Sequence, residues 1–510
     1  MGVRYDLAPE DIPPTGLSDV EGVRLNSAAA AEKVLGTASY QSLAALAGTP
    51  TLTAAGEFQI PNSTKEVFIV AGDKFYEYHS SAWTDRTGSV TITAGDDNTW
   101  EWVRAYDNLV LCNGVDTNAF KWDGSTSDAT DLDVDSRFTK PKHVAFWDNR
   151  LWVGGENTNA DRVWHSDAGD IETWGASSFY NLGSPVTAVV PMQNALAIHT
   201  EDAIHTLIPT GNATIPYQLQ QRTSSDPNNP QRGGTLSARA TVTLPGNVQL
   251  FPLDDGIYMW GGGDTIQKVS HALDIGYWDD VNVDRLGQSF AVYYAKENEV
   301  WFWLPHGSGQ TNMNHVMIMS TKHTYADPIT GEQRFAWMGP LTGSAATFER
   351  NCAAIIDNKP HAGTFGGKLL DHQPSNTYNH ETAAYTSMFE TGAPPPIDSA
   401  TRNRWLFARH YYDALGSYTL SVTQEGDGLG TNSTTLATTG GGAALDSFVL
   451  DTDTLGSKRM VSKTTRLRGY DPHSSIKYAN NNADESFRLR RTHLQFKPTG
   501  RPHKAEAGVL

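Results

Sequence analysis

The stretch Val67-Phe68-Ile69-Val70-Ala71-Gly72-Asp73-Lys74-Phe75-Tyr76-Glu77-Tyr78 determines the fold that we expect for this chain. It begins with an apolar run, continues through a Gly-Asp turn and ends in a second run that carries aromatic residues. Short apolar or alternating runs on either side of Gly, Asn or Asp are typical of β-hairpins. The segment is therefore predicted to form two antiparallel strands.

Units of this kind recur along most of the first 370 residues. A second copy runs from Leu109 through the turn Asn113-Gly114 to Trp122, and a less regular copy covers 361–365. Multi-stranded repeats of about 40–50 residues are typical of propeller blades. We therefore predict an all-β fold with a β-propeller of about six or seven blades. The marker residues of six units lie 42, 42, 45, 54 and 50 residues apart, and they are Val67, Leu109, Leu151, Leu196, Leu250 and Val300.

The composition is that of a large folded protein. The chain has 510 residues, of which 39% are hydrophobic and 10% are aromatic, so it is not a disordered chain. This length would ordinarily give about two to four domains, although all the blades of a propeller count as one. The 46 glycines and 25 prolines fit a structure of many short strands joined by turns.

The two cysteines, Cys112 and Cys352, each lie in an apolar segment. Neither belongs to a CxxC or Cys/His spacing, so we expect no disulfide framework and no structural zinc. The first residues lack the apolar core of a secretory signal, and no run of about 18 apolar residues occurs. The sequence therefore predicts no membrane-spanning helix, and it fits assembly in a reducing cytoplasm.

Changes in composition divide the chain into four expected regions. The N-terminal arm includes two segments that favour short helical turns, 27–34 and 42–46. The propeller contains a polar insertion at about 212–234, and a linker after it contains Pro394-Pro395-Pro396, which cannot join a sheet. The last region is predicted to be an additional C-terminal β module resembling a sandwich, with basic last strands. The four regions are 1–60, 61–372, 373–402 and 403–510.

Charge is distributed unevenly along the chain. The net charge is −18, but residues 458–510 contain 12 Lys or Arg against 4 Asp or Glu, so residues 1–457 carry −26. The basic residues near the C-terminus are candidates either for sequence-independent contact with nucleic-acid phosphates or for an interface with the acidic body of a neighbouring copy. These candidates are Arg466, Arg468, Lys477, Arg488, Arg490, Arg491, Lys497 and Arg501.

No motif in the sequence predicts catalysis. The acidic pairs Asp254-Asp255 and Asp279-Asp280 could supply a glycosidase or bind calcium, but adjacent turn carboxylates are usually solvated. The segment from His165 to Trp174 is similar to the Asp-box turn of sialidase-type propellers, and a structural turn explains it better. No Gly-x-Ser-x-Gly, P-loop or HExxH pattern occurs. We expect a protein that is not an enzyme, with no catalytic residues, metal or cofactor.

Several segments together suggest a family. At the N-terminus Asp6-Leu7-x-Pro9 is followed by 22–25 and 31–34, and near the C-terminus stands Phe487-Arg488-Leu489-Arg490-Arg491. Between them, Asp148 to Gly155 leads to Trp164 to Asp170. With these segments and the order of its regions, the chain resembles the tail hub, or nozzle, proteins of short-tailed bacteriophages, also called packaged DNA stabilisation proteins.

The resemblance implies a structural virion protein of the phage tail that is assembled in the host cytoplasm. Such a protein forms a homo-oligomeric ring, a hexamer, below the head-to-tail connector, where it extends the DNA channel, retains the packaged genome and permits its ejection. Its implied partners are the connector ring, tail fibres or spikes, and packaged double-stranded DNA. An acidic lumen would let DNA slide without sticking.

Two other function classes stay open. A receptor- or glycan-binding propeller would present Trp and Tyr clusters on loops. A propeller glycoside hydrolase, which ranks third, would need carboxylates and arginines gathered in the central pocket.

Overall fold

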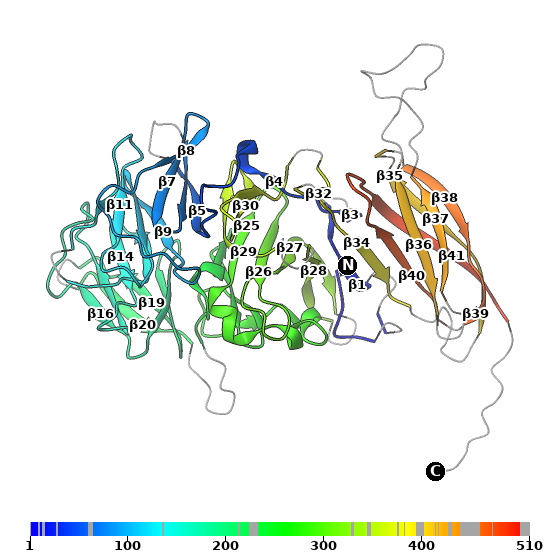
Figure 1. Cartoon of the computed structure of the whole chain (residues 1–510). Coiled ribbons are helices and arrows are strands. Elements are labelled where there is room, and N and C mark those ends of the chain that lie inside the picture. The colour runs from blue at the N-terminus through cyan, green and yellow to red at the C-terminus, as the bar shows by residue number, and fades with distance from the viewer. Residues whose placement is uncertain are drawn as a thin grey trace.

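The chain was analysed as a computed structural model (Figure 1). The structure describes residues 2–8, 11–12, 16–26, 29–59, 65–134, 137–212, 215–223, 233–327, 331–343, 348–374, 377–381, 383–393, 402–413, 415–416, 418–426, 431–438, 460–471 and 473–499. Structural statements below refer to these residues.

Seven antiparallel sheets of four strands each occupy most of the described chain up to residue 371, as the hairpin repeats predict. The first four sheets consist of β5 (Leu52–Gln59), β6 (Lys65–Ala71), β7 (Lys74–His79) and β8 (Ala82–Asp85); β9 (Glu101–Ala105), β10 (Asn108–Cys112), β11 (Phe120–Trp122) and β12 (Thr130–Asp131); β13 (His143–Trp147), β14 (Arg150–Gly154), β15 (Arg162–His165) and β16 (Phe179–Asn181); and β17 (Val186–Pro191), β18 (Leu196–Thr200), β19 (Ile204–Pro209) and β20 (Tyr217–Gln221). The other three consist of β21 (Val242–Leu244), β22 (Val248–Leu253), β23 (Gly256–Trp260) and β24 (Gln267–Lys268); β25 (Phe290–Tyr294), β26 (Glu299–Leu304), β27 (His315–Ala326) and β28 (Gln333–Leu341); and β29 (Arg350–Ile356), β30 (Lys359–Thr364), β31 (Leu369–Asp371) and β4 (Ala38–Ser39).

The first strands of these sheets surround one cavity of about 370 Å³. All seven sheets contribute to its lining, either from the first strand or from the residue just before it. Strands arranged radially around a common axis are the defining feature of propellers, and the fold is accordingly all-β and propeller-like. The lining includes Ala55, Glu101, Val144, Val189, Thr241, Phe290 and Cys352.

Apolar and aromatic side chains fill the space between neighbouring sheets. Trp152 is fully buried in β14, and its indole Nε1 donates a hydrogen bond to the Trp147 carbonyl at 3.0 Å. Its ring contacts Tyr217 of the next sheet, with ring centroids 5.1 Å apart. The aromatic residues that mark the sequence repeat therefore pack between sheets, because their large apolar rings gain most from burial there.

The seventh sheet is completed by a strand from the other end of the sequence. Ala38 and Ser39 of β4 pair antiparallel with Asp371 and Leu370 of β31. In addition, β5 begins at Leu52, so the first four-stranded sheet starts nine residues before the predicted domain boundary at residue 61. The later part of the predicted N-terminal arm, with β4 and β5, thus belongs to the propeller-like body.

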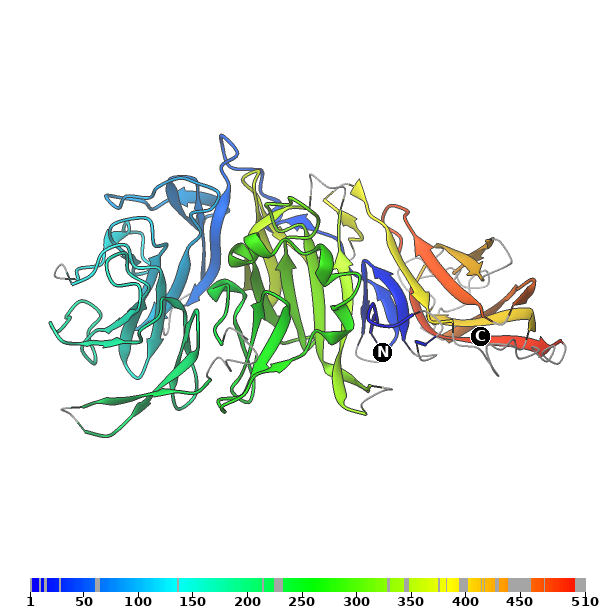
Figure 2. The same cartoon turned by 90° about the horizontal axis from the view of Figure 1, so that it is seen from below.

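Two further sheets follow in the C-terminal region, and in both views they lie at one end of the molecule (Figure 1, Figure 2). Their inner faces meet, since His410 of one sheet bonds the Tyr478 hydroxyl of the other at 2.9 Å. The five-stranded sheet has the order β1 (Leu17–Glu21), β34 (Ser387–Thr391), β40 (Ser475–Asn480), β36 (Thr419–Glu425) and β37 (Asn432–Ala437). The six-stranded sheet has the order β2 (Val23–Leu25), β3 (Ala31–Lys33), β41 (Arg488–Pro498), β35 (Asn403–Asp413) and β38 (Met460–Arg466), with β39 (Tyr470–Asp471) beside β35.

The N-terminal arm supplies three strands to these two sheets, and one of them, β3, lies in the segment 27–34 where a short helical turn was expected. Leu17 pairs with Thr391, and Ala31 of β3 pairs with Leu489 of β41. The alanine-rich segment forms a strand because β2 and β41 offer backbone hydrogen-bond partners on both sides, and such tertiary pairing outweighs a weak helix propensity.

The remaining described elements are short. The predicted linker contributes β34, so it is not a simple connection, and its proline run lies outside the described residues. The predicted insertion includes β20, and its residues 213–214 and 224–232 also lie outside the described residues. The other elements are β32 (Asn379–His380), β33 (Ala383–Ala384) and the 3-10 turns η1 (Tyr40–Ser42), η2 (Ala238–Ala240), η3 (His271–Leu273), η4 (Trp278–Asp280) and η5 (Val283–Gln288).

Candidate functional site: a basic face on the C-terminal sheets

Strand register gathers cationic side chains on the outward face of the six-stranded sheet. Residues opposite each other in an antiparallel pair point to the same face. Arg404 lies opposite Lys497, Tyr411 lies opposite Arg491, and Phe407 lies opposite Arg466. Three neighbouring strands, β41, β35 and β38, thus share one basic surface.

We call this surface the basic sheet face. Its five cations, Arg404, Arg409, Arg466, Arg491 and Lys497, are all exposed. The same register places Asp413 at the end of this face on β35, opposite Met460, and the Asp413 carboxylate is paired with Arg490. The face comprises Arg404, Phe407, Arg409, Tyr411, Ser462, Thr464, Arg466, Tyr470, Arg491, His493, Gln495 and Lys497.

Aromatic rings alternate with the cations on this face. The Arg491 guanidinium lies 4.4 Å from the ring centroid of Tyr411, and the Arg404 guanidinium lies 6.0 Å from that of Tyr470. Tyr470 is 54% exposed, which is unusual for a large aromatic residue. Stacking holds the guanidinium groups in place while their outer edges stay available to a carboxylate or phosphate.

A shallow pocket of about 240 Å³ lies at one end of the face. Arg404, Arg466, Arg468 and Tyr470 contribute to its lining, which includes no carboxylate. Three guanidinium groups around one hollow make a site for an anionic group, because arginine can bind carboxylate or phosphate oxygens bidentately.

The structure separates the eight predicted basic residues. Arg466, Arg491 and Lys497 share the basic sheet face, and Arg468 lines the pocket at its end. Lys477 lies on β40 in the other sheet. Arg501 lies outside the described residues.

Arg488 and Arg490 are each paired with a carboxylate of the same chain. The Arg488 Nε atom lies 2.7 Å from Glu32, and the Arg490 Nε atom lies 2.6 Å from Asp413. These two arginines therefore hold strands together, and they are poor candidates for an external anion.

Sequence analysis missed Arg404 and Arg409. They lie at the start of the predicted C-terminal β module, and their charge was not counted with the cluster at 458–510. The spacing Phe407, Arg409, Tyr411 would have placed Arg409 on an outward face. Only the strand pairing shows that this face continues onto β41 and β38.

A junction of buried charges connects the propeller-like body to the C-terminal sheets. Arg24 Nε donates to Glu32 at 3.1 Å, and its Nη1 lies 3.7 Å from Glu299 of β26. Burial raises the pKa of the Glu299 carboxyl to about 7, and the Arg24 charge opposes that shift. Together with the Arg488–Glu32 pair, these contacts link β2, β3, β26 and β41.

The central cavity ends in a second, more polar cavity of about 260 Å³ that shares Glu101, Ala238 and Arg239 with it. Here His143 Nδ1 lies 2.8 Å from Glu101 Oε1. His143 and Thr187 both line this cavity. The His143 Nε2 atom and the Thr187 hydroxyl are buried without a hydrogen-bond partner among the described residues. Burial lowers the pKa of Arg239 to about 10.

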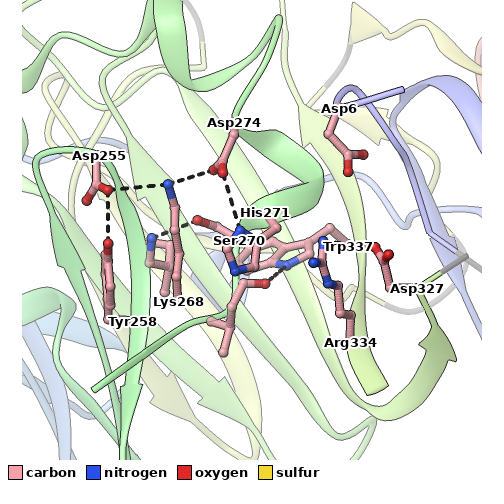
Figure 3. Close-up of polar contacts among 12 residues, drawn as sticks. Asp6, Asp255, Tyr258, Lys268, Ser270, His271, Asp274, Asp327, Arg334 and Trp337 are labelled. Carbon is pink, nitrogen blue, oxygen red and sulfur yellow. Dashed lines mark hydrogen bonds and ion pairs between the residues drawn. The ribbon is translucent and has the colours of Figure 1, made fainter. Parts of the chain in front are cut away.

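The acidic pair Asp254-Asp255 lies near a network of polar contacts (Figure 3). Lys268 Nζ lies between two carboxylates, 3.4 Å from Asp255 and 2.9 Å from Asp274, and the Tyr258 hydroxyl donates to Asp255 at 2.9 Å. These contacts connect β23, β24 and the residue that follows η3. Asp255 therefore holds neighbouring segments together.

The segment similar to an Asp-box forms a hydrogen-bonded turn. Asp170 accepts from the Glu172 backbone N–H at 2.8 Å and from the Thr173 hydroxyl at 2.7 Å. These bonds lower the pKa of the Asp170 carboxyl. Trp174, which ends the segment, is buried, so the contacts are those of a structural turn.

The described residues contain neither a cluster suited to a metal ion nor a helix suited to crossing a membrane. No group of three or more His, Cys, Asp or Glu side chains in them is arranged to hold a metal ion. In the same residues no helix has the length and apolarity needed to cross a membrane.

Comparisons with known proteins give a limited result. No protein-family model matches the chain, and no curated protein matches it. Among solved structures, the computationally designed Ika8 protein is similar with a TM-score of 0.37 and 14% identity, over 66% of this chain and 98% of that one. The extracellular domain of a one component system from B. thetaiotaomicron is similar with a TM-score of 0.42 and 8% identity. The similarity covers 76% of this chain and 55% of that one. Similarity at this level carries no argument about function.

Proposed function

We propose that this protein is a structural component of a short-tailed phage tail, a ring-forming hub or nozzle. In this role it extends the DNA channel below the head-to-tail connector, retains the packaged DNA and permits its ejection. Its partners are other copies of the chain in a hexamer, the connector ring, tail fibres or spikes, and packaged DNA. It acts in the virion and has no catalytic residues.

One observation carries the proposal, namely that a single N-terminal segment supplies strands to both parts of the molecule. The strands β1, β2 and β3 belong to the C-terminal sheets, while β4 completes the seventh four-stranded sheet. We propose that the seven sheets are blades of one propeller, that β4 closes its ring, and that the C-terminal sheets form a sandwich. Two parts joined in this way would make a stiff wall element for a larger particle.

The charge distribution supports the same proposal. Residues 1–457 carry −26, so the body of the protein would repel the phosphates of passing DNA. The resemblance of the N-terminal and C-terminal segments to tail hub proteins gives the particular role.

Electron microscopy and native mass spectrometry of the purified full-length chain test the proposal. We expect closed rings that also bind the purified connector ring of the same phage. A chain that stays monomeric at micromolar concentration and does not bind the connector would contradict the proposed role.

A second candidate function, binding of a receptor glycan, is favoured by the polar cavity at the end of the central cavity. Its lining includes the polar residues Asn113 and Gln288 together with Glu101 and Arg239, which suit a hydroxyl-rich ligand. A glycan array probed with the labelled chain tests this, and an array without signal would exclude the glycans displayed. Hydrolysis of chromogenic glycosides would point to the third candidate, a glycoside hydrolase.

A further inference from the structure

We propose that the basic sheet face binds an acidic surface of a second copy of this chain. This inference rests on the proposed function, because it names the surface through which neighbouring copies in the ring meet. The face was defined above by strand register on β35, β38, β39 and β41.

The composition of the face is that of a protein interface. Four of its five cations are arginines, and Phe407, Tyr411 and Tyr470 lie among them. Arginine and aromatic residues are enriched where proteins meet, whereas lysine and the acidic residues are depleted. A surface selected only for contact with DNA phosphates would have no need of the aromatic residues, since phosphates are bound by charge and hydrogen bonds.

The partner surface must be acidic, and the rest of this chain has an acidic composition. Asp413 at the end of the face is already paired with Arg490, so the five exposed cations remain to meet an apposed acidic surface. Residues 1–457 have a net charge of −26, and this total already includes the positive charges of Arg404 and Arg409. Apposition of oppositely charged surfaces favours association and fixes its orientation.

A contact between unlike surfaces also has the geometry that a ring requires. When the basic face of one copy meets an acidic surface of the next, the first copy still has its own acidic surface available. The second copy still has its own basic face available, so each can bind a further neighbour. Such head-to-tail contacts form closed rings if the rotation between copies closes. A two-fold contact between two basic sheet faces would place cations against cations and is therefore disfavoured.

Charge reversal tests the proposal. The variant Arg404→Glu/Arg409→Glu/Arg466→Glu changes three exposed side chains, so its fold should be retained, which circular dichroism and the melting temperature check. The matched control Lys65→Glu/Lys74→Glu/Lys296→Glu makes the same change in net charge on the propeller-like body, where these side chains are also exposed. Mass photometry then gives the distribution of oligomers.

We expect rings for the wild-type chain and the control, and mostly monomers for the basic-face variant, with self-association at least about a hundredfold weaker. A carbodiimide, which joins Lys amines to carboxyl groups, should link Lys497 to Asp or Glu of another copy in a mixture of 14N- and 15N-labelled chains. A rise in salt concentration should weaken the wild-type rings.

Other results would overturn the inference. If the basic-face variant forms rings as well as the wild type does, the face is not the contact between copies, while the proposed hub role stands. If the variant forms rings but loses affinity for a double-stranded DNA fragment that the wild type binds, the face binds nucleic acid instead. A wild-type chain that is monomeric under all conditions would contradict both the inference and the proposed function.

Discussion

The seven four-stranded sheets and the two C-terminal sheets bury their strands in different ways. In the four-stranded sheets most strands pair with their neighbours in sequence, and apolar and aromatic side chains fill the spaces between sheets. In the C-terminal pair, strands from the N-terminal arm form one edge of each sheet beside strands from the other end of the chain, and a polar group lies at the centre. The comparison shows one body held mainly by repeated local packing and another held by long-range pairing and specific polar contacts.

The polar group at the centre of the C-terminal pair is His410. It is fully buried, its Nδ1 contacts the Tyr478 hydroxyl at 2.9 Å, and its Nε2 contacts the Thr465 hydroxyl at 2.7 Å. Both ring nitrogens therefore have partners, and the desolvation cost of burying them is offset. Removing or protonating this ring should affect the C-terminal pair more than the four-stranded sheets.

The largest effect is expected from truncation of a large ring between the four-stranded sheets. Trp152→Ala should reduce the free energy of unfolding by about 3–5 kcal/mol, because it leaves a cavity and removes the hydrogen bond to Trp147. Denaturant titration followed by circular dichroism measures the loss. The control Ile215→Ala changes a side chain that is 61% exposed and should cost less than about 0.5 kcal/mol. Equal losses in the two variants would show that Trp152 is not packed as described.

A smaller effect is expected at the junction between the two regions. Glu32→Gln should cost about 3 kcal/mol, since Arg24 and Arg488 lose the carboxylate that both contact, and Arg24 stays buried beside Glu299. Thermal unfolding with limited proteolysis should show that the C-terminal sheets open first. In contrast Lys65→Ala, which removes an exposed partner of Glu57, should change stability by no more than about 1 kcal/mol. If both substitutions have the same small effect, the junction is not a buried network.

The smallest predicted effect concerns pH. Burial lowers the pKa of His410 to about 4, whereas an unfolded chain keeps a value of about 6.5. Between these two values the unfolded chain binds the proton and the folded chain does not. The stability that neutral His410 contributes above pH 6.5 is therefore lost progressively as the pH falls towards 4.

The conservative variant His410→Gln should show a flatter decline in melting temperature between pH 7 and pH 5 than the wild type. A difference of about 2 kcal/mol is expected between pH 6.5 and pH 5. His79→Gln, at an exposed position, serves as the control and should leave the slope unchanged. Identical slopes for all three chains would mean that His410 takes up its proton as easily in the folded protein as in the unfolded one.

The sequence alone was enough to predict the all-β class and the repeated units, because each unit is a set of consecutive strands. The hairpin from Lys65 to His79 forms as predicted, with Ala71 paired to Lys74 across the Gly-Asp turn. The aromatic residues of the repeat also lie where a propeller-like fold needs them. The strand β4, which completes the seventh four-stranded sheet, was not predicted, since Ala38-Ser39 has no pattern of its own.

Local pattern thus determined which segments become strands and which faces are apolar, since the two-residue period and the turn residues act over a few positions. Only the tertiary structure decided that Leu17 pairs with Thr391 and that Arg404, Arg466 and Lys497 share one face. The physical reason is that such pairings depend on which edges remain unpaired after the local hairpins have formed, and no short segment carries that information.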